Sequence, residues 1–377
     1  MRLKVQNLVQ KMVQTDSTTS TIEVASIYQE FLIENGYSVK LDEYEPTKAN
    51  VEVRIGPSNA KKIIISGHMD TVPIGNPDIW THHPFSGKIV DGKLWGRGSV
   101  DMKGGTGTLA GVMVELLIHE DDLQYEVILA ATADEEVGLL GAHNFVKKGL
   151  MENAEHLLIA EPTSLGVAIM EKGIIFGNVL AYGKQAHASR PDLGHNAIEA
   201  LARLMPKLHG ILPDVSTPEL GKSTLNIGVI QGGTVANVVP EMAEMSIDYR
   251  MTPGVENELV LSRLKEILVN NSSDGIRYEL KDNNTINKPA LISSTTELGD
   301  KLADYSEKYT GVKPTLGGMF YATDAAEFIG NKNMSFAIYG PGSTELLHQT
   351  NERLSLKELD ISRQVIRDTV LELAMIK

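Results

Sequence analysis

The sequence predicts an α/β protein in which a mixed sheet carries helices on both faces and a second domain of the α+β class is inserted. In the first half of the chain, short apolar segments alternate with helical segments, which is typical of a sheet whose strands are connected by helices. Between residues 173 and 286 the order becomes strand, helix, strand, strand, helix, strand, which is the ferredoxin-like order. The expected domains are therefore 1–172 and 287–377 together, with 173–286 as the insertion.

The elements of the first part follow from periodicity and from turn residues. A first helix is expected because apolar residues recur at helical spacing at Val5, Leu8, Val9, Met12 and Val13. The segment "TDSTTST" (15–21) ends that helix and offers caps for a second one, which ends near Gly36. Further strands are expected at 37–44, 50–55, 61–67, 125–134 and 156–162, and further helices at 103–120 and 138–149. The small residues "GGTGTLAG" (104–111) lack the G-x-G-x-x-G spacing of a phosphate loop, so helix packing is the favoured interpretation.

The insertion and the final part are predicted in the same way. The insertion has expected strands at 174–182, 223–231, 243–251 and 276–281, and helices at 194–211 and 255–270. The final part has an expected helix at 294–310, a strand at 334–340 and a last helix at 356–376. The alternation of strand and helix therefore resumes after the insertion.

Composition narrows the function classes. The 377 residues are enough for more than one domain, and 35 basic against 49 acidic residues give a formal charge of −14, which disfavours nucleic-acid binding. There is no cysteine, so disulfides and thiolate metal sites are excluded. The start "MRLKVQNLVQ" lacks the apolar region of a secretory signal, and no segment approaches the length of a membrane span. We therefore expect a cytoplasmic protein with neither a nucleic-acid nor a membrane partner.

Ionisable residues follow three of the expected strands. His68 and Asp70 follow the first, in "GHMDTVP"; Glu135 and Glu136 follow the second, in "ADEEVG"; and Glu161 follows the third, in "AEPT". Ligands of open α/β sheets bind outside the carboxyl ends of the strands, so a shared cleft is expected. Each acid alone is typical of a helix cap or a solvated turn, but independent surface acids rarely all fall at strand ends.

Two more residues complete a candidate metal centre, namely Asp101 in "GRGSVDMKGG" and His348 in "LHQTNE". Two histidines and three carboxylates could fill two metal sites, and imidazole favours Zn, Co or Mn over Mg. One carboxylate bridging two ions about 3.5–4 Å apart would make a two-metal hydrolase site. A lone histidine such as His348 is more often structural, so the interpretation depends on the joint pattern.

Three carboxylates near the metals have expected roles of different kinds. Glu135 and Glu136 are adjacent and point to different places, so one can bind a metal while the other acts as general base. Asp70, two residues after His68, can accept a hydrogen bond from the imidazole and orient it.

The five motifs resemble those of the co-catalytic zinc amidohydrolases and peptidases. This family includes aminoacylase, acetylornithine deacetylase, succinyl-diaminopimelate desuccinylase and glutamate carboxypeptidase. The motifs are "SGHMDTVP", "GRGSVDMKGG", "TADEEVG", "AEPT" and "LHQTNE", and they run in the family's order from residue 66 to residue 352. The resemblance implies a zinc-exopeptidase-like catalytic domain, an inserted dimerisation and lid domain, and a homodimer. It also implies two divalent metal ions per chain, with Zn as the first choice and Co or Mn as alternatives.

The resemblance also assigns roles to the candidate residues. His68 and Glu161 would hold one metal, Glu136 and His348 the other, and Asp101 would bridge them. Glu135 would be the general base and Asp70 would orient His68, and a cis peptide bond is implied after Asp101. Glu161, where many dipeptidases of the family carry Asp, is similar to the desuccinylase and deacetylase branch.

Four further residues match family segments outside the metal centre. Arg250 in "DYRMTP" is similar to the family's carboxylate-binding Arg, although a strand-end salt bridge is the alternative. Asn237 in "GGTVANVVP" is similar to a substrate-contacting Asn, whereas Thr323 in "FYATDAAEF" departs from the family's Gly-Thr-Ser or Ser-Thr-Asp segment. His187 in "HASRP" is similar to the His that reaches the neighbouring subunit's site and stabilises an oxyanion; alone, it would be read as a solvated surface residue.

The resemblance therefore implies a two-metal hydrolase that cleaves the amide bond of a small N-acylated amino acid. The implied activity is most like that of succinyl-diaminopimelate desuccinylase or acetylornithine deacetylase. Two alternatives remain open: a metallo-dipeptidase or carboxypeptidase on the same scaffold, and a metal-free binding protein that kept the fold. Loss of metal ligands would indicate the binding protein, and no ligand is lost from this sequence.

Overall fold

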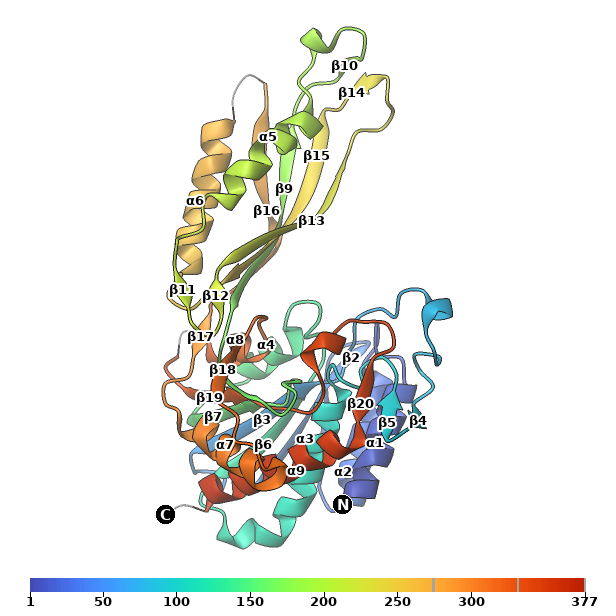
Figure 1. Ribbon diagram of the computed structural model, residues 1–377, viewed down its shortest axis with the longest axis vertical. Coiled ribbons are helices and arrows are strands. Elements are labelled where there is room, and N and C mark those ends of the chain that lie inside the picture. Colours follow the sequence, from blue (N-terminus) through green and yellow to red (C-terminus); the bar gives the residue numbers. More distant parts are fainter. Residues whose placement is uncertain (273–274, 331, 376–377) are drawn as a thin grey trace. The chain divides into compact units, whose positions relative to one another are not determined.

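The computed structural model describes residues 1–272, 275–330 and 332–375, and the chain divides into two compact units (Figure 1). The first unit comprises Met1–Ile169, Ile292–Gly317 and Thr323–Lys377, and the second comprises Met170–Leu291 and Gly318–Ala322. The sequence-based boundaries placed 318–322 with the final part of the chain. It belongs instead to the second unit because Gly318 lies directly against the side chains of Met170 and Leu220.

A mixed nine-stranded sheet forms the centre of the first unit, in the order β1-β2-β6-β3-β7-β19-β8-β17, with β18 paired to β8. Its strands are β1 (Lys40–Glu45), β2 (Lys48–Ile55), β3 (Lys62–His68), β6 (Glu126–Thr132), β7 (Ala154–Ile159), β8 (Val167–Glu171), β17 (Leu291–Ile292), β18 (Leu316–Met319) and β19 (Ser335–Ile338). Strand β3 runs parallel to β6 and β7, and β19 runs parallel to β7, whereas β1, β2 and β8 pair in the antiparallel sense. A small separate sheet has the order β20-β5-β4, from β4 (Lys88–Val90), β5 (Lys93–Trp95) and β20 (Arg353–Ser355).

Helices cover both faces of the large sheet, as the sequence predicts. The helices are α1 (Arg2–Gln14), α2 (Ile22–Glu34), α3 (Lys103–Leu116), α4 (Leu140–Lys147), α7 (Glu297–Thr310), α8 (Ala325–Ile329) and α9 (Leu356–Ala374), with single turns η1 (Pro77–Ile79), η2 (Leu117–Asp122) and η4 (Thr344–Leu346). Helix α3 packs against α1 and α9, and α4 packs against α8. Every residue of β3 and β6 is buried. Because successive side chains of a strand point to opposite faces, such burial requires cover on both sides.

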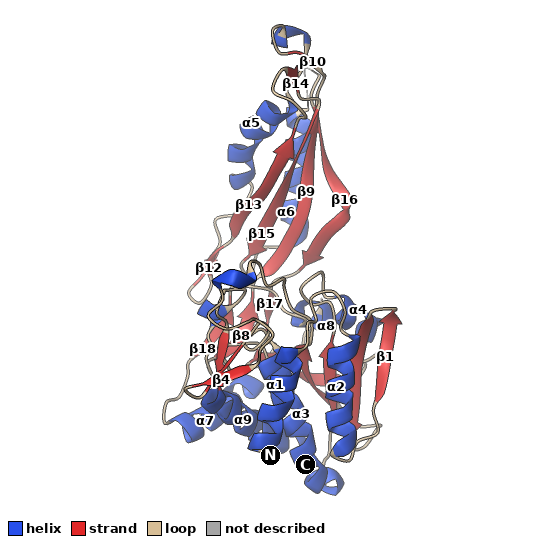
Figure 2. Ribbon diagram, turned by 90° about the vertical axis from the view of Figure 1, so that its right-hand side faces the viewer, coloured by secondary structure: helices blue, strands red, loops and turns tan. Residues whose placement is uncertain are grey.

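The second unit is ferredoxin-like. Its elements are β9 (Gly173–Tyr182), β10 (Ala186–His187), η3 (Pro191–Leu193), α5 (Ala197–His209), β11 (Ser216–Thr217), β12 (Gly221–Lys222), β13 (Thr224–Gly232), β14 (Val238–Val239), β15 (Met242–Met251), α6 (Asn257–Asn271) and β16 (Arg277–Lys288). The antiparallel sheet has the order β13-β15-β9-β16, with α5 and α6 on one face (Figure 2). Alternate residues of β15 are buried, which fits a sheet that packs on helices with one face only.

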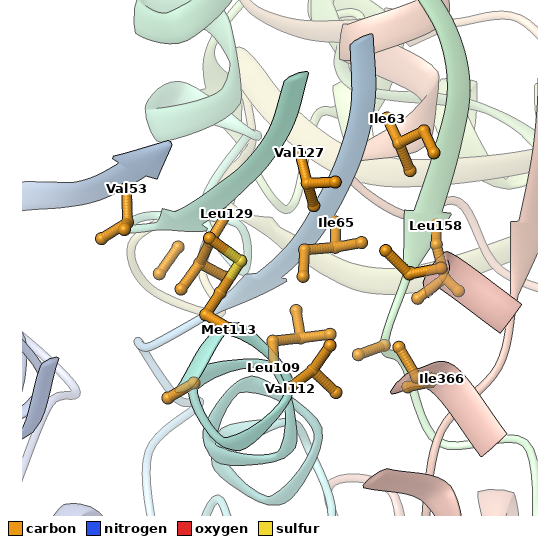
Figure 3. Packing of buried hydrophobic residues seen from close by; sticks show 14 of the residues in the cluster. Val53, Ile63, Ile65, Leu109, Val112, Met113, Val127, Leu129, Leu158 and Ile366 are labelled. Atoms are coloured by element: carbon orange, nitrogen blue, oxygen red, sulfur yellow. The ribbon is translucent and has the colours of Figure 1, made fainter. Parts of the chain in front are cut away.

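The core of the first unit joins the central strands to α3 and α9. Figure 3 shows Ile63 and Ile65 of β3 beside Val127 and Leu129 of β6, facing Leu109 of α3. Helix α3 approaches the sheet closely because small residues open it: a Cβ on Gly105 would lie 1.9 Å from the main-chain oxygen of Ala160. This contact brings the start of α3, and the loop before it, to the carboxyl end of β7. Helix packing is thus confirmed for the 104–111 segment.

None of the helices in the described part of the chain combines the length and the apolar character that crossing a bilayer requires.

We predict that Ile65→Ala lowers the free energy of unfolding by about 2–5 kcal/mol, because Ile65 is fully buried and its loss leaves a cavity. Chemical denaturation monitored by far-UV circular dichroism measures this change. The control is Ile118→Ala, since Ile118 is 83% exposed and its replacement should change stability little. Equal effects of the two replacements would contradict the packing described for β3.

Candidate metal centre

The parallel strands bring the predicted residues to one edge of the large sheet. His68 is the last residue of β3 and pairs with Thr132, the last residue of β6. Glu135 and Glu136 lie in the turn after β6, and Glu161 lies two residues after the end of β7. The register of the three strands therefore places four ionisable side chains at the same edge.

The carboxylate of Asp101 lies between the two histidines. Its Oδ1 is 3.1 Å from Nε2 of His68, and its Oδ2 is 3.1 Å from Nε2 of His348. Glu161 Oε1 is 3.4 Å from Nε2 of His68, and Glu136 Oε2 is 3.2 Å from Nε2 of His348. Two groups of three donor atoms are thus formed, and each group uses a different oxygen of Asp101.

These distances fit two metal ions. Donor atoms bound about 2.0–2.1 Å from a tetrahedral ion lie roughly 3.3 Å from one another. The measured separations of 3.1–3.4 Å bracket that value. Donor atoms of His68, Asp101 and Glu136, which belong to both groups, also lie within 4.8 Å of one another, so the two groups adjoin. The imidazole nitrogens and carboxylate oxygens, without thiolates, match the ligand preferences of Zn, Co and Mn.

Neighbouring carboxylates raise the pKa values of both histidines in this cluster. Burial alone would lower the pKa of His68, but Asp101 and Glu161 raise that pKa well above its usual value. Hydrogen bonds to Asp101 and Glu136 raise the pKa of His348 to about 10. Burial raises the pKa of Glu161 to about 7, against the opposing effect of His68. The cluster therefore favours positive charge at both histidines, where the proposed ions would lie.

The orientation of His68 differs from the sequence-based expectation. Nδ1 of His68 donates to the main-chain oxygen of Asp70 at 3.0 Å, while the Asp70 carboxylate is 3.6 Å away. That carboxylate instead accepts the main-chain N–H groups of Glu135 (3.2 Å) and Glu136 (3.1 Å). A carbonyl can only accept, so Nδ1 carries a proton, and a cation bound at Nε2 would replace the proton that Nε2 shares with Asp101 and Glu161. Asp70 thus fixes both the imidazole and the turn that carries the two glutamates.

Glu135 lies in an acid-rich environment beside the candidate ligands. Burial raises its pKa well above the usual value, and the acids Glu136, Asp324 and Glu161 act in the same direction, while His68 opposes them. A carboxylate with a raised pKa holds a proton more readily than an ordinary glutamate does.

Asp324 is a buried acid near the centre that the sequence analysis missed. Its Oδ2 accepts a hydrogen bond of 2.6 Å from the hydroxyl of Thr132, and its Oδ1 has no hydrogen-bond partner within the described ranges. The signal for it is the acid in the segment "ATDAAEF", directly after the candidate Thr323. The Thr323 hydroxyl accepts the main-chain N–H of Ala325. The peptide bond between Asp101 and Met102 is cis, as the resemblance implies.

Of the three candidate residues of the second unit, His187 and Asn237 lie on neighbouring segments and Arg250 lies apart from them. His187 lies on β10 opposite Val238 of β14, and the main-chain oxygen of Asn237 accepts the N–H of Ala188 at 3.0 Å. Arg250 lies on β15, paired with both carboxylate oxygens of Asp248 at 2.8 and 3.1 Å.

The length of the sheet separates them. Arg250 pairs with Ile174 at the start of β9, whereas the β10–β14 pair follows the far end of β9 at Tyr182 (Figure 1). Eight residues of strand span roughly 27 Å. A single chain therefore keeps Arg250 far from the segment of His187 and Asn237.

Comparisons with known proteins relate the chain to metallopeptidases and desuccinylases. The profile of peptidase family M20/M25/M40 matches residues 64–372. A probable succinyl-diaminopimelate desuccinylase of Staphylococcus aureus strain MRSA252 is 30% identical over 350 residues, covering 84% of this chain and 85% of that protein. The succinyl-diaminopimelate desuccinylase of Methylorubrum extorquens is 31% identical over 327 residues, covering 84% of this chain and 83% of that protein. Among solved structures, an M20 family metallo-carboxypeptidase from Sulfolobus solfataricus is similar with a TM-score of 0.84, at 17% identity and 99% coverage of both chains.

We predict that Asp324→Asn stabilises the metal-free protein at pH 8 and has little effect at pH 4. Burial raises the pKa of Asp324 from 3.8 to about 7, so between these values the folded chain binds more protons than the unfolded chain and stability falls as pH rises. Asparagine keeps an acceptor for Thr132 and carries no charge. The gain at pH 8 should be up to about 4 kcal/mol, at 1.36 kcal/mol per pKa unit.

Urea unfolding in the presence of a chelator, at both pH values, measures this difference. The exposed Asp121 provides the control, and Asp121→Asn should be neutral at both pH values. A gain from Asp324→Asn that is the same at pH 4 and pH 8 would contradict the assigned pKa shift.

Proposed function

The chain belongs to the peptidase family M20/M25/M40 and is a metal-dependent hydrolase, and from this premise we propose that it uses two divalent metal ions to hydrolyse the amide bond of a small N-acylated amino acid. The observation that carries the proposal is the position of Asp101, whose two carboxylate oxygens face two separate groups of ligand atoms. A carboxylate placed in this way can bridge two ions.

The proposed ligand sets follow from the distances. His68 and Glu161 join Oδ1 of Asp101 around one position, and His348 and Glu136 join Oδ2 around the other. We propose Zn as the metal, with Co or Mn as alternatives. When bound, the ions supply positive charge that polarises the substrate carbonyl and lowers the pKa of water.

Glu135 is the proposed general base. It takes the proton of the attacking water and then passes that proton to the leaving amine, which breaks the carbon–nitrogen bond and yields a carboxylate and an amine. Asp70 supports this role because its carboxylate binds the main-chain N–H of Glu135 and so holds the turn in place.

The proposed acyl group is succinyl, with acetyl as the nearest alternative. Glu161 and the desuccinylase names of two relatives support this preference. Arg250 is the proposed partner of the substrate carboxylate; its guanidinium is bound by Asp248, so the substrate would have to replace that partner or add to it. Thr323 is the proposed acyl-pocket residue; since it has no exposed surface, its segment would have to move for the side chain to reach a substrate.

We predict that the metal-loaded protein holds two ions per chain and cleaves N-succinyl amino acids faster than N-acetyl amino acids or dipeptides. Elemental analysis gives the metal content, and a substrate panel with Zn, Co and Mn supplied separately gives the rates. Full activity with one ion or none would refute the two-metal proposal. Preferential cleavage of dipeptides would instead identify a metallo-dipeptidase on the same scaffold.

Glu135→Gln is the matched control in that experiment. It keeps the shape of the side chain and removes the base, so metal content should stay normal while kcat falls by roughly 10²–10⁴-fold. Activity within a few-fold of the parent protein would show that another group is the base.

We further propose a homodimer formed through the second unit, in which His187 of one chain completes the site of the other. Two features support this arrangement. The sheet of the second unit separates His187 from Arg250 within one chain, and the edge strand β13 exposes the apolar side chains of Val229 and Ile230. His187 is an exposed imidazole that can donate to a developing oxyanion, an interaction worth about 3–4 kcal/mol.

We predict that His187→Ala and Glu135→Ala are each inactive alone and regain activity when their subunits exchange. A mixed dimer then has one site with both residues, so activity should return to at most half of the normal sites. As a control, the double variant mixed with either single variant forms no complete site and should stay inactive. If exchange is shown by mass spectrometry and the mixture of single variants remains inactive, the shared site is wrong.

A further inference from the structure

A buried carboxylate holds the main chain of the loop that carries Asp101. Glu352 has no exposed surface. Its Oε1 accepts the N–H groups of Val100 at 2.7 Å and of Asp101 at 3.0 Å. Its Oε2 accepts the N–H of Gly98 at 3.1 Å and a guanidinium N–H of Arg97 at 2.7 Å. Both oxygens are therefore used twice, and each partner is a donor.

Arg97 extends this connection to other segments around the centre. The guanidinium, only 3% exposed, donates to the main-chain oxygens of Gln349 at 3.3 Å and Pro73 at 3.4 Å. It also lies over the ring of Trp80, 5.2 Å from the centroid. One ion pair thus contacts the segment after His68, the loop before Asp101 and the segment after His348.

The small sheet explains why these two residues meet although 255 positions separate them in sequence. Strand β20 pairs with β5, and Arg353 lies opposite Trp95. The main-chain oxygen of Glu352 accepts the N–H of Gly96 at 3.0 Å, which continues the pairing by one step. Glu352 directly precedes β20, and Arg97 lies two residues after β5, so this pairing brings the two residues side by side.

The two metal positions have different supports. His68 ends strand β3 and Glu161 lies two residues after strand β7, and the two strands are paired by main-chain hydrogen bonds. His348 lies in a loop, its side chain 53% exposed, and it is close in sequence to Glu352. The position of His348 relative to Asp101 therefore depends on the contacts of Glu352 and Arg97.

We propose that Glu352 and Arg97 are positioning residues that hold Asp101 and His348 in register and so set the affinity for the ion at the His348–Glu136 position. The inference rests on the proposed two-metal site. A carboxylate suits this role because it accepts hydrogen bonds at all four contacts, whereas a glutamine amide must turn its NH₂ group toward donors. A buried ion pair adds little net stability, so a positional role accounts for its presence better than stability does.

Glu352→Gln tests the proposal with Zn alone as the probe, in competition with a chromophoric chelator. The dissociation constant of the weaker Zn should rise about 10–100-fold, the usual effect of losing a residue that orients a ligand. The tighter Zn, assigned to His68 and Glu161, also uses Asp101 but keeps two ligands held by strands, so its dissociation constant should rise less than that of the weaker Zn. With Co as the probe, the visible spectrum of the second equivalent should change while that of the first is retained. Arg97→Lys keeps the charge but loses the planar fork, so it should cause a smaller loss in the same direction.

Glu115→Gln is the matched control, because Glu115 of α3 pairs with the buried Arg363 of α9 in the same unit, away from the ligands. It should lower stability and leave both Zn affinities unchanged. If Glu352→Gln binds both Zn ions as tightly as the parent protein does, the proposal is overturned and the Glu352–Arg97 pair has a structural role only. If Glu352→Gln does not fold, the Zn affinities of Arg97→Lys provide the test: a weaker second Zn supports the proposal, and unchanged affinities overturn it. A parent protein that binds fewer than two ions would instead refute the proposed function itself.

Discussion

The arrangement of the first unit depends on one carboxylate that is shared between two groups of ligands. Asp101 can face both histidines only if its loop lies at the carboxyl ends of β3 and β7. The small residues at the start of α3 make that approach possible, since Gly105 rests on the main chain of Ala160. The geometry of the centre thus depends on the close contact between helix α3 and the sheet.

The same arrangement is costly when no cation is present. Burial raises the pKa values of Asp70, Glu135, Glu161 and Asp324, which means that each resists ionisation in the folded chain. Buried charges without a counter-charge destabilise proteins. A group of acids at one sheet edge therefore suits a site that takes up positive ions, and ion binding would then contribute to stability by mass action.

The sequence predicts those helices, strands and site residues that depend on local patterns. The long helices and strands were found because their periodicity is strong, and the strand ends located His68, Glu135, Glu136 and Glu161. Contacts between distant segments have no such pattern: the Asp70 main-chain oxygen, rather than its carboxylate, binds His68, and the burial of Glu352 against Arg97 depends on the β5–β20 register. Short elements such as β4, β5 and β20 were missed because three residues carry too little periodicity.

The second unit explains why a complete substrate site cannot be inferred from one chain. Its ten-residue strands β9 and β15 are straight hydrogen-bonded spacers, so residues at their two ends cannot approach one another by side-chain movement. Arg250 and the His187–Asn237 segment lie at such opposite ends. Either these residues serve different sites, or a second chain brings one end of its sheet to the other chain's centre. No rearrangement of a single ferredoxin-like unit could unite the two ends without unpairing its strands, so the two alternatives differ in whether one chain or two supply the residues of a site.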